Sequence, residues 1–160
     1  MTGGEHHYTT TITWTGNPGG GTSKRGSHSR NHEIAIDGKP TLLGSSDPGF
    51  RGDPTRHNPE DLLVASLSAC HMLWFLSLCG KAGIAVTAYV DDAVGTMAED
   101  ADGGGHFTSV VLKPTITLAP GSDRAKADEF HHEAHQKCFI SQSVNFPTTV
   151  EATYMEETNA

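Results

Sequence analysis

The longest apolar segment of the chain runs from Leu62 to Cys79 and contains no Lys, Arg, Asp or Glu. Asn58 and Pro59 stand before it; Asn is a favoured N-cap residue and Pro fits the first helical turn. Asp61, three residues after the cap, places negative charge at the positive end of the helix dipole. The pattern predicts a helix that begins after Asn58 and ends at Gly80.

This predicted helix is apolar on all faces and therefore needs cover on all sides. Its length barely reaches that of a membrane span, and it contains polar residues such as Ser66, Ser68 and His71. We therefore expect protein, not a membrane, around it. A chain of 160 residues offers few other elements, so we expect part of the cover to come from a second copy of the chain.

Five other segments are predicted to form strands, and the first, second and fifth of them alternate apolar and polar residues, as half-buried strands do. They are residues 8–14, 32–36, 84–97, 107–118 and 145–154. Glycine-rich turns separate the first two strands and the next two, so each pair predicts a hairpin. The segment 41–57 is rich in Gly and Pro and predicts an irregular loop.

A second helix is expected from Asp123 to about Cys138, with Ser122 as its cap. Its apolar residues form one narrow stripe, Ala127, Phe130, Ala134 and Cys138. The predicted order is β-β-α-β-β-α-β. This order predicts a single α+β domain over residues 1–160, made of two β-hairpins, two helices and a closing strand.

The charge and the cysteine content narrow the function. The net charge of −8 argues against nucleic acid as a partner. The first residues show no basic region followed by an apolar core, so we expect no signal peptide. Three cysteines are too few for a disulfide framework, which together with the missing signal peptide favours a cytoplasmic protein. No membrane partner is expected, because the apolar helix barely reaches the length of a membrane span.

Helix geometry separates the cysteines. Cys70 and Cys79 lie nine positions apart on one helix, about 13 Å along its axis and on opposite faces, which is too far for a disulfide. Within one subunit only Cys138 could meet Cys70, and Cys79 is expected to fill the core. Cys70 itself is either a small core residue or a reactive thiol that needs a nearby cation.

Other chemistry is less well supported. His131 and His135 share one face of the second helix, a spacing that suits a transition metal, but no further pair of ligands accompanies them. We therefore expect a solvated histidine face and no metal. His71 follows Cys70, but adjacent helical positions diverge by about 100°, which favours a packed core histidine over a general base. No Ser lies in a Gly-x-Ser-x-Gly elbow, which argues against a serine hydrolase.

Two motifs carry a resemblance to a known family. They are NPEDLLVA at 58–65 leading to SACH at 68–71, and AHQKC at 134–138. In order and spacing they resemble the OsmC/Ohr family of bacterial peroxide-defence proteins, from about Tyr8 to the end of the chain. The sequence after Cys138 lacks the proline of the hydroperoxide-resistance branch, so the chain is more similar to the broader OsmC-like branch.

The resemblance implies an intertwined homodimer with the cysteine helices buried at its centre. It further implies a thiol-dependent peroxidase that reduces organic hydroperoxides in oxidative stress defence, without cofactor or metal. Cys70 matches the peroxidatic cysteine and Cys138 the resolving cysteine, so that a Cys70-Cys138 disulfide forms in each cycle. An external dithiol, lipoyl-type or a small molecule, is the expected reductant.

The resemblance also implies the charged residues of the site. Arg25 resembles the arginine that activates the thiolate, with Arg51 and Arg56 as rivals. Glu60 resembles the carboxylate that pairs with this arginine. Glu60 lies about 15 Å from Cys70 along the helix, so a Glu60 that serves this cysteine would come from the partner chain.

Two other functions stay open from the sequence. One is a non-enzymatic binding protein that holds an apolar ligand in the dimer cavity, with Cys70 merely lining it. The other is a thiol redox sensor that passes its oxidation state to a partner.

Overall fold

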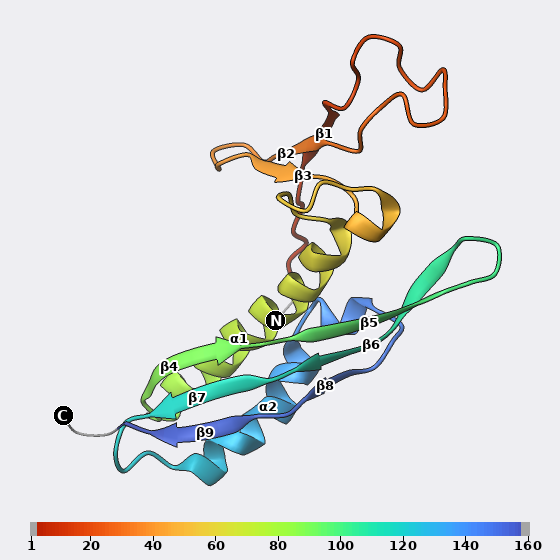
Figure 1. The fold of residues 1–160 in the computed structure, drawn as a ribbon. Helices are drawn as coiled ribbons and strands as arrows, with labels where there is room; N and C mark the ends of the chain where they lie inside the picture. Colours follow the sequence, from red (N-terminus) through yellow and green to blue (C-terminus); the bar gives the residue numbers. More distant parts are fainter. Residues whose placement is uncertain (1–2, 158–160) are drawn as a thin grey trace. The chain divides into compact units, whose positions relative to one another are not determined.

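The computed structural model describes residues 3–157. The chain forms two compact units, residues 3–62 and 63–157, and each is described by itself (Figure 1). The structure is of the mixed α+β class with two α-helices, as the sequence predicts. The single domain over residues 1–160 stays a prediction.

The first unit contains a three-stranded antiparallel sheet in the order β1-β2-β3. β1 (Thr11–Trp14) and β2 (His32–Ala35) form the predicted hairpin, with Ile12 opposite Ile34. β3 (Leu42–Gly44) lies in the segment expected to be irregular. Its apolar run is only two residues long, too short for an alternating pattern, and it is held by pairing with β2. A 3-10 helix follows at Pro48–Phe50.

Helix α1 (Pro59–Lys81) begins where the sequence predicts. The Asn58 side chain accepts a hydrogen bond from the Asp61 backbone N–H at 2.7 Å, which confirms Asn58 as the N-cap. At the other end Gly83 adopts a positive φ of 71°, and the Ile84 N–H donates to the Cys79 carbonyl at 3.0 Å. Glycine adopts this left-handed conformation without strain, so the helix ends there.

The long predicted hairpin of the second unit is present, but both of its arms are broken. The first arm is β4 (Val86–Asp91) and β5 (Val94–Glu99), and the second is β6 (Gly105–Leu112) and β7 (Pro114–Leu118). Between β6 and β7 the Lys113 N–H donates to the Asp91 carboxylate at 2.6 Å instead of to a strand. Pro114 has no N–H to contribute to the strand pairing, so the ladder is interrupted at this point.

The closing strand is broken in the same way, into β8 (Thr148–Val150) and β9 (Thr153–Glu156). Each piece pairs in parallel with one arm of the hairpin, β8 with β6 and β9 with β7. The second unit therefore has two three-stranded sheets, in the orders β5-β6-β8 and β4-β7-β9.

Helix α2 (Arg124–Lys137) starts one residue later than expected. Asp123 is its N-cap, and its carboxylate accepts from the Lys126 N–H at 2.9 Å. The expectation that Ser122 caps this helix is wrong, because Ser122 belongs to the preceding turn, where its N–H donates to the Ala119 carbonyl.

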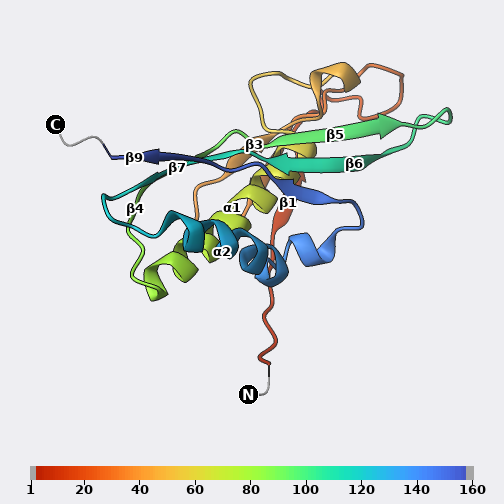
Figure 2. The same cartoon turned by 90° about the horizontal axis from the view of Figure 1, so that it is seen from below.

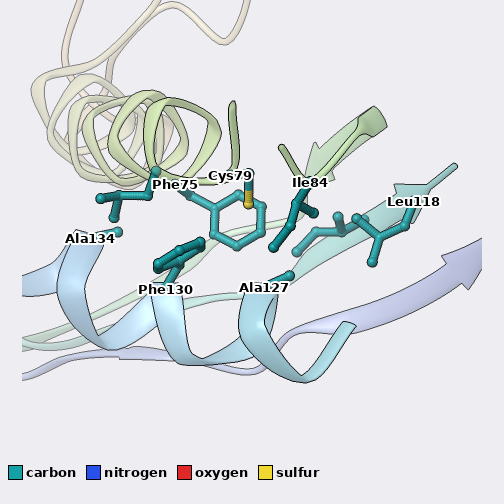
Figure 3. Packing of buried hydrophobic residues seen from close by; sticks show 9 residues of the cluster. Phe75, Cys79, Ile84, Leu118, Ala127, Phe130 and Ala134 are labelled. Carbon is teal, nitrogen blue, oxygen red and sulfur yellow. The ribbon is translucent and has the colours of Figure 1, made fainter. Parts of the chain in front are cut away.

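The helices of the second unit lie on the same face of the strands (Figure 2). A core cluster joins them to β7 through Phe75 and Cys79 of α1, Ala127, Phe130 and Ala134 of α2, and Ile84, Ile116 and Leu118 (Figure 3). A second cluster forms around Leu67, Val110 and Leu112. Strand β5 lies close to α1, since a Cβ on Gly95 of β5 would lie 2.6 Å from the side chain of Val64 of α1.

One face of α1 is left open in the second unit. The buried side chains of the helix are Leu67, His71, Phe75, Leu78 and Cys79. Ala65, Ala69, Leu73 and Ser77, four residues apart, are exposed, and Leu73 is 64% exposed. By length and composition alone α1 could also cross a membrane, but its buried side is packed against protein.

Candidate active site

The structure brings Cys70 and Cys138 together. Cys70 is partly exposed near the middle of α1, and Cys138 is fully buried at the C-cap of α2. The two thiols lie near enough that Cys138 raises the pKa of the Cys70 thiol. Both cysteines are free thiols, so the pair is present in its reduced form.

The turn that follows Cys138 directs a backbone N–H group at the Cys138 sulfur. Cys138 leaves the helical conformation with ψ 107°, and the Ser141 N–H donates to its sulfur at 3.4 Å. The backbone amides of Ile140 and Phe139, in the same turn, lower the pKa of the Cys70 thiol. Within residues 3–157 neither of these two amides is bound to a backbone carbonyl, so they are available to the thiolate.

Opposing effects act on the acidity of Cys70. Burial raises the pKa of the Cys70 thiol, and the hydrogen bond with the Cys138 thiol raises it further. The amides of Ile140 and Phe139 lower this pKa, because they donate to the charged form. The net direction is upward, so a cation from elsewhere is needed to make Cys70 a thiolate at neutral pH.

Cys79 lies away from this site, in the core. It is 1% exposed and packs in the cluster with Phe75 and Ala127. Burial raises the pKa of its thiol to about 11. Cys79 is therefore an inert core residue, as helix geometry predicts.

A buried histidine pair joins α1 to α2 beside the cysteines. His71 Nε2 and His131 Nδ1 are 2.9 Å apart and hydrogen-bonded, and the two ring planes are within 5° of parallel. Phe75 stacks on His131 with ring centroids 4.3 Å apart. His71 is a packed core histidine, as expected. The expectation of a solvated histidine face is wrong for His131, because this residue points inward and is 7% exposed.

The pair has polar neighbours but no set of metal ligands. Burial lowers the pKa of His71 to about 4, and His131 and His135 contribute to this. Burial also lowers the pKa of His131, against the charges of Asp128 and Asp91. In the described part of the chain, no three His, Cys, Asp or Glu side chains are grouped to hold a metal ion.

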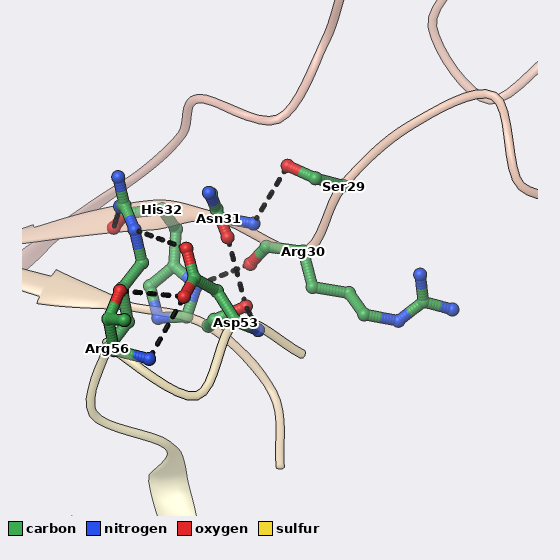
Figure 4. A network of polar contacts seen from close by, with 8 residues as sticks. Ser29, Arg30, Asn31, His32, Asp53 and Arg56 are labelled. Atoms are coloured by element: carbon green, nitrogen blue, oxygen red, sulfur yellow. Dashed lines mark hydrogen bonds and ion pairs between the residues drawn. The ribbon is translucent and has the colours of Figure 1, made fainter. Parts of the chain in front are cut away.

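The charged residues named from the resemblance belong to the first unit. Arg25 and Arg51 are exposed, and neither forms an ion pair within residues 3–157. Arg56 is engaged locally, with its Nε 3.6 Å from Asp53 and its Nη1 donating to the His32 carbonyl (Figure 4). Hydrogen bonds from Thr55 lower the pKa of Asp53, and the charge of Arg56 lowers it to a smaller degree. Arg56 thus has a structural role.

Glu60 lies in the first turn of α1. Its Oε2 atom is buried and has no hydrogen-bond partner among the described residues. A buried carboxylate oxygen without a partner is costly, so this atom marks a place where a further donor is needed.

Sequence reasoning missed two features of the site. The amides of the turn after Cys138 are backbone groups, and no residue type announces them. His131 was assigned to the surface, although it stands seven positions, or two helical turns, before Cys138. That spacing places it on the same face as Cys138 and could have indicated its inward direction.

The family model described as OsmC-like protein matches residues 52–153. Among curated proteins, the peroxiredoxin OsmC of Escherichia coli (strain K12) is 28% identical over 94 residues. That match covers 59% of this chain and 64% of the relative, so the chain matches less than two thirds of the curated relative.

Solved structures show the same fold. An OsmC-like protein of unknown function from Vibrio cholerae O1 biovar eltor str. N16961 is 30% identical with a TM-score of 0.85, over 93% of this chain and all of that one. An organic hydroperoxide resistance protein from Elizabethkingia anophelis is 24% identical with a TM-score of 0.66, over 96% and 99% of the two chains. The chain belongs to the OsmC-like protein family.

Proposed function

We propose that the chain is a thiol-dependent peroxidase that reduces organic hydroperoxides, in defence of the cytoplasm against oxidative stress. The observation that carries the proposal is that Cys70 and Cys138 lie near enough for Cys138 to raise the pKa of the Cys70 thiol, which two backbone amides of the following turn lower. A nucleophilic thiol beside a second thiol that can resolve it is typical of redox-active cysteines. Relatives named peroxiredoxin and organic hydroperoxide resistance protein support the same chemistry.

In the first step the Cys70 thiolate attacks the terminal oxygen of the hydroperoxide. An S–O bond forms while the O–O bond breaks, and the sulfur gives up two electrons to become a sulfenic acid. The alkoxide takes up one proton, matching the proton that the thiol released, and leaves as an alcohol. The amides of Ile140 and Phe139 stabilise the thiolate before the attack.

In the second step Cys138 resolves the sulfenic acid. An S–S bond forms and the S–O bond breaks, and the hydroxyl leaves as water with the proton of the Cys138 thiol. Cys138 is buried beside Cys70, so it reaches the sulfur without crossing solvent. An external dithiol, lipoyl-type or a small molecule, then reduces the Cys70-Cys138 disulfide by exchange and is itself oxidised.

Activation of Cys70 requires a cation, because burial raises the pKa of its thiol. We assign this role to Arg25, with Arg51 as the alternative, since Arg56 is already engaged with Asp53. Glu60 would orient the arginine through its unpartnered carboxylate oxygen. In a homodimer built on the open face of α1, the arginine and Glu60 of one chain would serve Cys70 of the other.

The surroundings of the thiols favour an organic hydroperoxide over hydrogen peroxide. Trp74 lies one helical turn after Cys70, and Phe139 directly follows Cys138; their ring centroids are 6.3 Å apart. Phe139 is 72% exposed, which leaves an aromatic surface free to contact an alkyl or aryl group. Apolar contact of this kind would bind the organic part of the substrate.

The proposal is tested by peroxide consumption in the presence of excess dithiol. Wild-type protein should consume cumene hydroperoxide faster than hydrogen peroxide, and Cys70→Ser should consume neither. Cys79→Ser is the matched control, because it removes a buried thiol outside the site. If wild-type protein and Cys70→Ser behave alike, the chain is not a peroxidase, and the binding-protein interpretation replaces this proposal.

A further inference from the structure

We propose that the hydrogen bond between His71 and His131 sets the register of α1 against α2 that brings Cys70 to Cys138. The two histidines would then be positioning residues for disulfide formation. This inference rests on the proposed function for its biological meaning, although its test does not require a hydroperoxide.

The two helices meet at two polar contacts. On α2, His131 and Cys138 are two turns apart, about 10.5 Å along the axis, and both are buried. On α1 their partners are the neighbouring residues His71 and Cys70. Ala134 stands between the two contacts on α2 and is fully buried, and its small side chain allows the helices to approach closely. Two separate contacts fix both the rotation and the sliding of α2, which a single contact cannot do.

Of the contacts along this interface, the histidine hydrogen bond is the one that depends strongly on direction. Apolar packing between Phe75 and Ala134 or Ala127 has no preferred angle and tolerates small shifts. A slide of one helical residue, about 1.5 Å, would separate the ring nitrogens, which are now 2.9 Å apart. His71 Nδ1 and His131 Nε2 already have no hydrogen-bond partner among the described residues. Breaking the bond would therefore leave all four buried nitrogens unpaired, which strongly disfavours the shifted register.

A changed register of the two helices should mainly affect one chemical step, the formation of the disulfide. The attack of Cys70 on a peroxide does not involve the Cys138 sulfur, so a changed register affects this step only through the amides of Ile140 and Phe139. Disulfide formation does need the register, because bonded cysteines require Cα atoms within about 7 Å and converging Cβ atoms. A rotation of α2 by one residue position would turn Cys138 by about 100° away from Cys70. Loss of the histidine pair should thus slow the second step much more than the first.

The test compares an apolar substitution with one that keeps the hydrogen bond. His131→Leu removes the ring nitrogens, whereas the amide oxygen of His131→Asn lies near the position of Nδ1 and can accept from His71. Disulfide formation is driven by diamide, a thiol oxidant, and followed by intact mass. His131→Leu should form the Cys70-Cys138 disulfide on the order of tenfold to a hundredfold more slowly than wild type, and His131→Asn should restore most of the rate.

The first step is measured separately in a Cys138→Ser background. There His131→Asn should alkylate at Cys70, and react with cumene hydroperoxide, at the rate of the Cys138→Ser parent. His131→Leu should be slower by no more than about three- to tenfold, the effect expected from displaced amides on the Cys70 thiolate. Ile116→Val is the matched control for stability, because it loosens the same core without removing a ring nitrogen. His71→Met is a second apolar variant with the same expected result, should His131→Leu not fold.

Two results would overturn the inference. One is a disulfide rate in His131→Leu and His71→Met equal to that of wild type. The other is an equal slowing by Ile116→Val, which would make the pair an ordinary core contact. A wild-type protein that ignores hydroperoxide but forms the disulfide with diamide would reject the proposed function and leave the positioning role standing.

Discussion

The Cys70 thiol is placed between influences that oppose one another. Burial and the Cys138 thiol keep it protonated, while the amides of Ile140 and Phe139 favour the thiolate. The C-terminal end of α2 carries partial negative charge, which by itself disfavours an anion nearby. The turn after Cys138 opposes this effect locally, because the Ser141 N–H donates to the Cys138 sulfur and the amides of Ile140 and Phe139 lower the pKa of Cys70.

The contribution of one amide can be measured with a proline substitution. Phe139→Pro removes the N–H that donates to Cys70, and Cys138 already has the extended ψ of 107° that a residue before proline adopts. We expect the pKa of Cys70 to rise and its oxidation at pH 7 to slow by roughly three- to tenfold. The measurement is the pH dependence of Cys70 alkylation in a Cys138→Ser background.

Phe139→Ala is the matched control for this prediction. It removes the exposed ring but keeps the backbone N–H, so the pKa of Cys70 should stay at its parent value. A proline variant that matches the alanine variant would show that the amide does not stabilise the thiolate.

At the scale of helices and strands, the sequence predicted those features that depend on residues close to one another in the chain. The start of α1 follows from Asn58 and Asp61, and the long hairpin follows from two predicted strands on either side of a glycine-rich turn. The breaks in those arms did not follow, because they depend on the Asp91 carboxylate, which binds the Lys113 N–H across the sheet. The histidine pair was missed for a similar reason. It depends on how two helices pack, and a single helix pattern does not contain that information.

The histidine pair predicts an acid-sensitive fold. His71 has a lowered pKa of about 4 when folded and about 6.5 when unfolded. Above pH 6.5 His71 is neutral in both states. As the pH falls towards 4, His71 takes up a proton in the unfolded state but stays neutral in the folded state. Stability should therefore fall between about pH 6.5 and 4 and level off below. The charges of Asp128 and Asp91 oppose the lowering of the His131 pKa. His135 contributes to the lowering of the His71 pKa.

This prediction is checked by urea unfolding at pH 7 and pH 5. Wild-type protein should lose about 2 kcal/mol more than His71→Gln between these two values, because Gln does not titrate. Equal losses in the two proteins would show that His71 takes up its proton as easily in the folded state as in the unfolded state.

At the scale of the whole molecule, the open face of α1 predicts a dimer. Leu73 is 64% exposed in the part of α1 between Leu62 and Gly80, which has no charged residue, and a shallow hollow beside it is lined by Leu73, Trp74 and Ser77. Burying such a face against a second copy removes apolar surface from water. We expect light scattering to give about twice 17.0 kDa.

A charge on this face should break the assembly. Leu73→Asp should shift the protein towards monomer, or towards aggregates, because it would bury an unpaired carboxylate in the interface. Val90→Asp, at an exposed apolar residue on β4, is the control and should stay dimeric. A wild-type protein that scatters as a stable folded monomer would contradict the dimer and the shared site that depends on it.

The cysteine pair is where sequence and structure agree most closely on the site, since helix geometry left only Cys138 within reach of Cys70. The roles of Arg25 and Glu60 follow from the resemblance and stay predictions. Their side chains belong to the first unit, so their distance to the thiols depends on how chains assemble. A single-chain pattern does not determine this.

The most direct measurement is the intact mass of wild type and Cys138→Ser after one equivalent of cumene hydroperoxide, with peptide mapping of the modified site. Wild type should lose two hydrogens and contain a Cys70-Cys138 disulfide, with Cys79 still free. Cys138→Ser should instead gain one oxygen at Cys70, as a sulfenic acid that dimedone traps. Unchanged masses in both proteins, or oxidation at Cys79 in place of Cys70, would contradict the account.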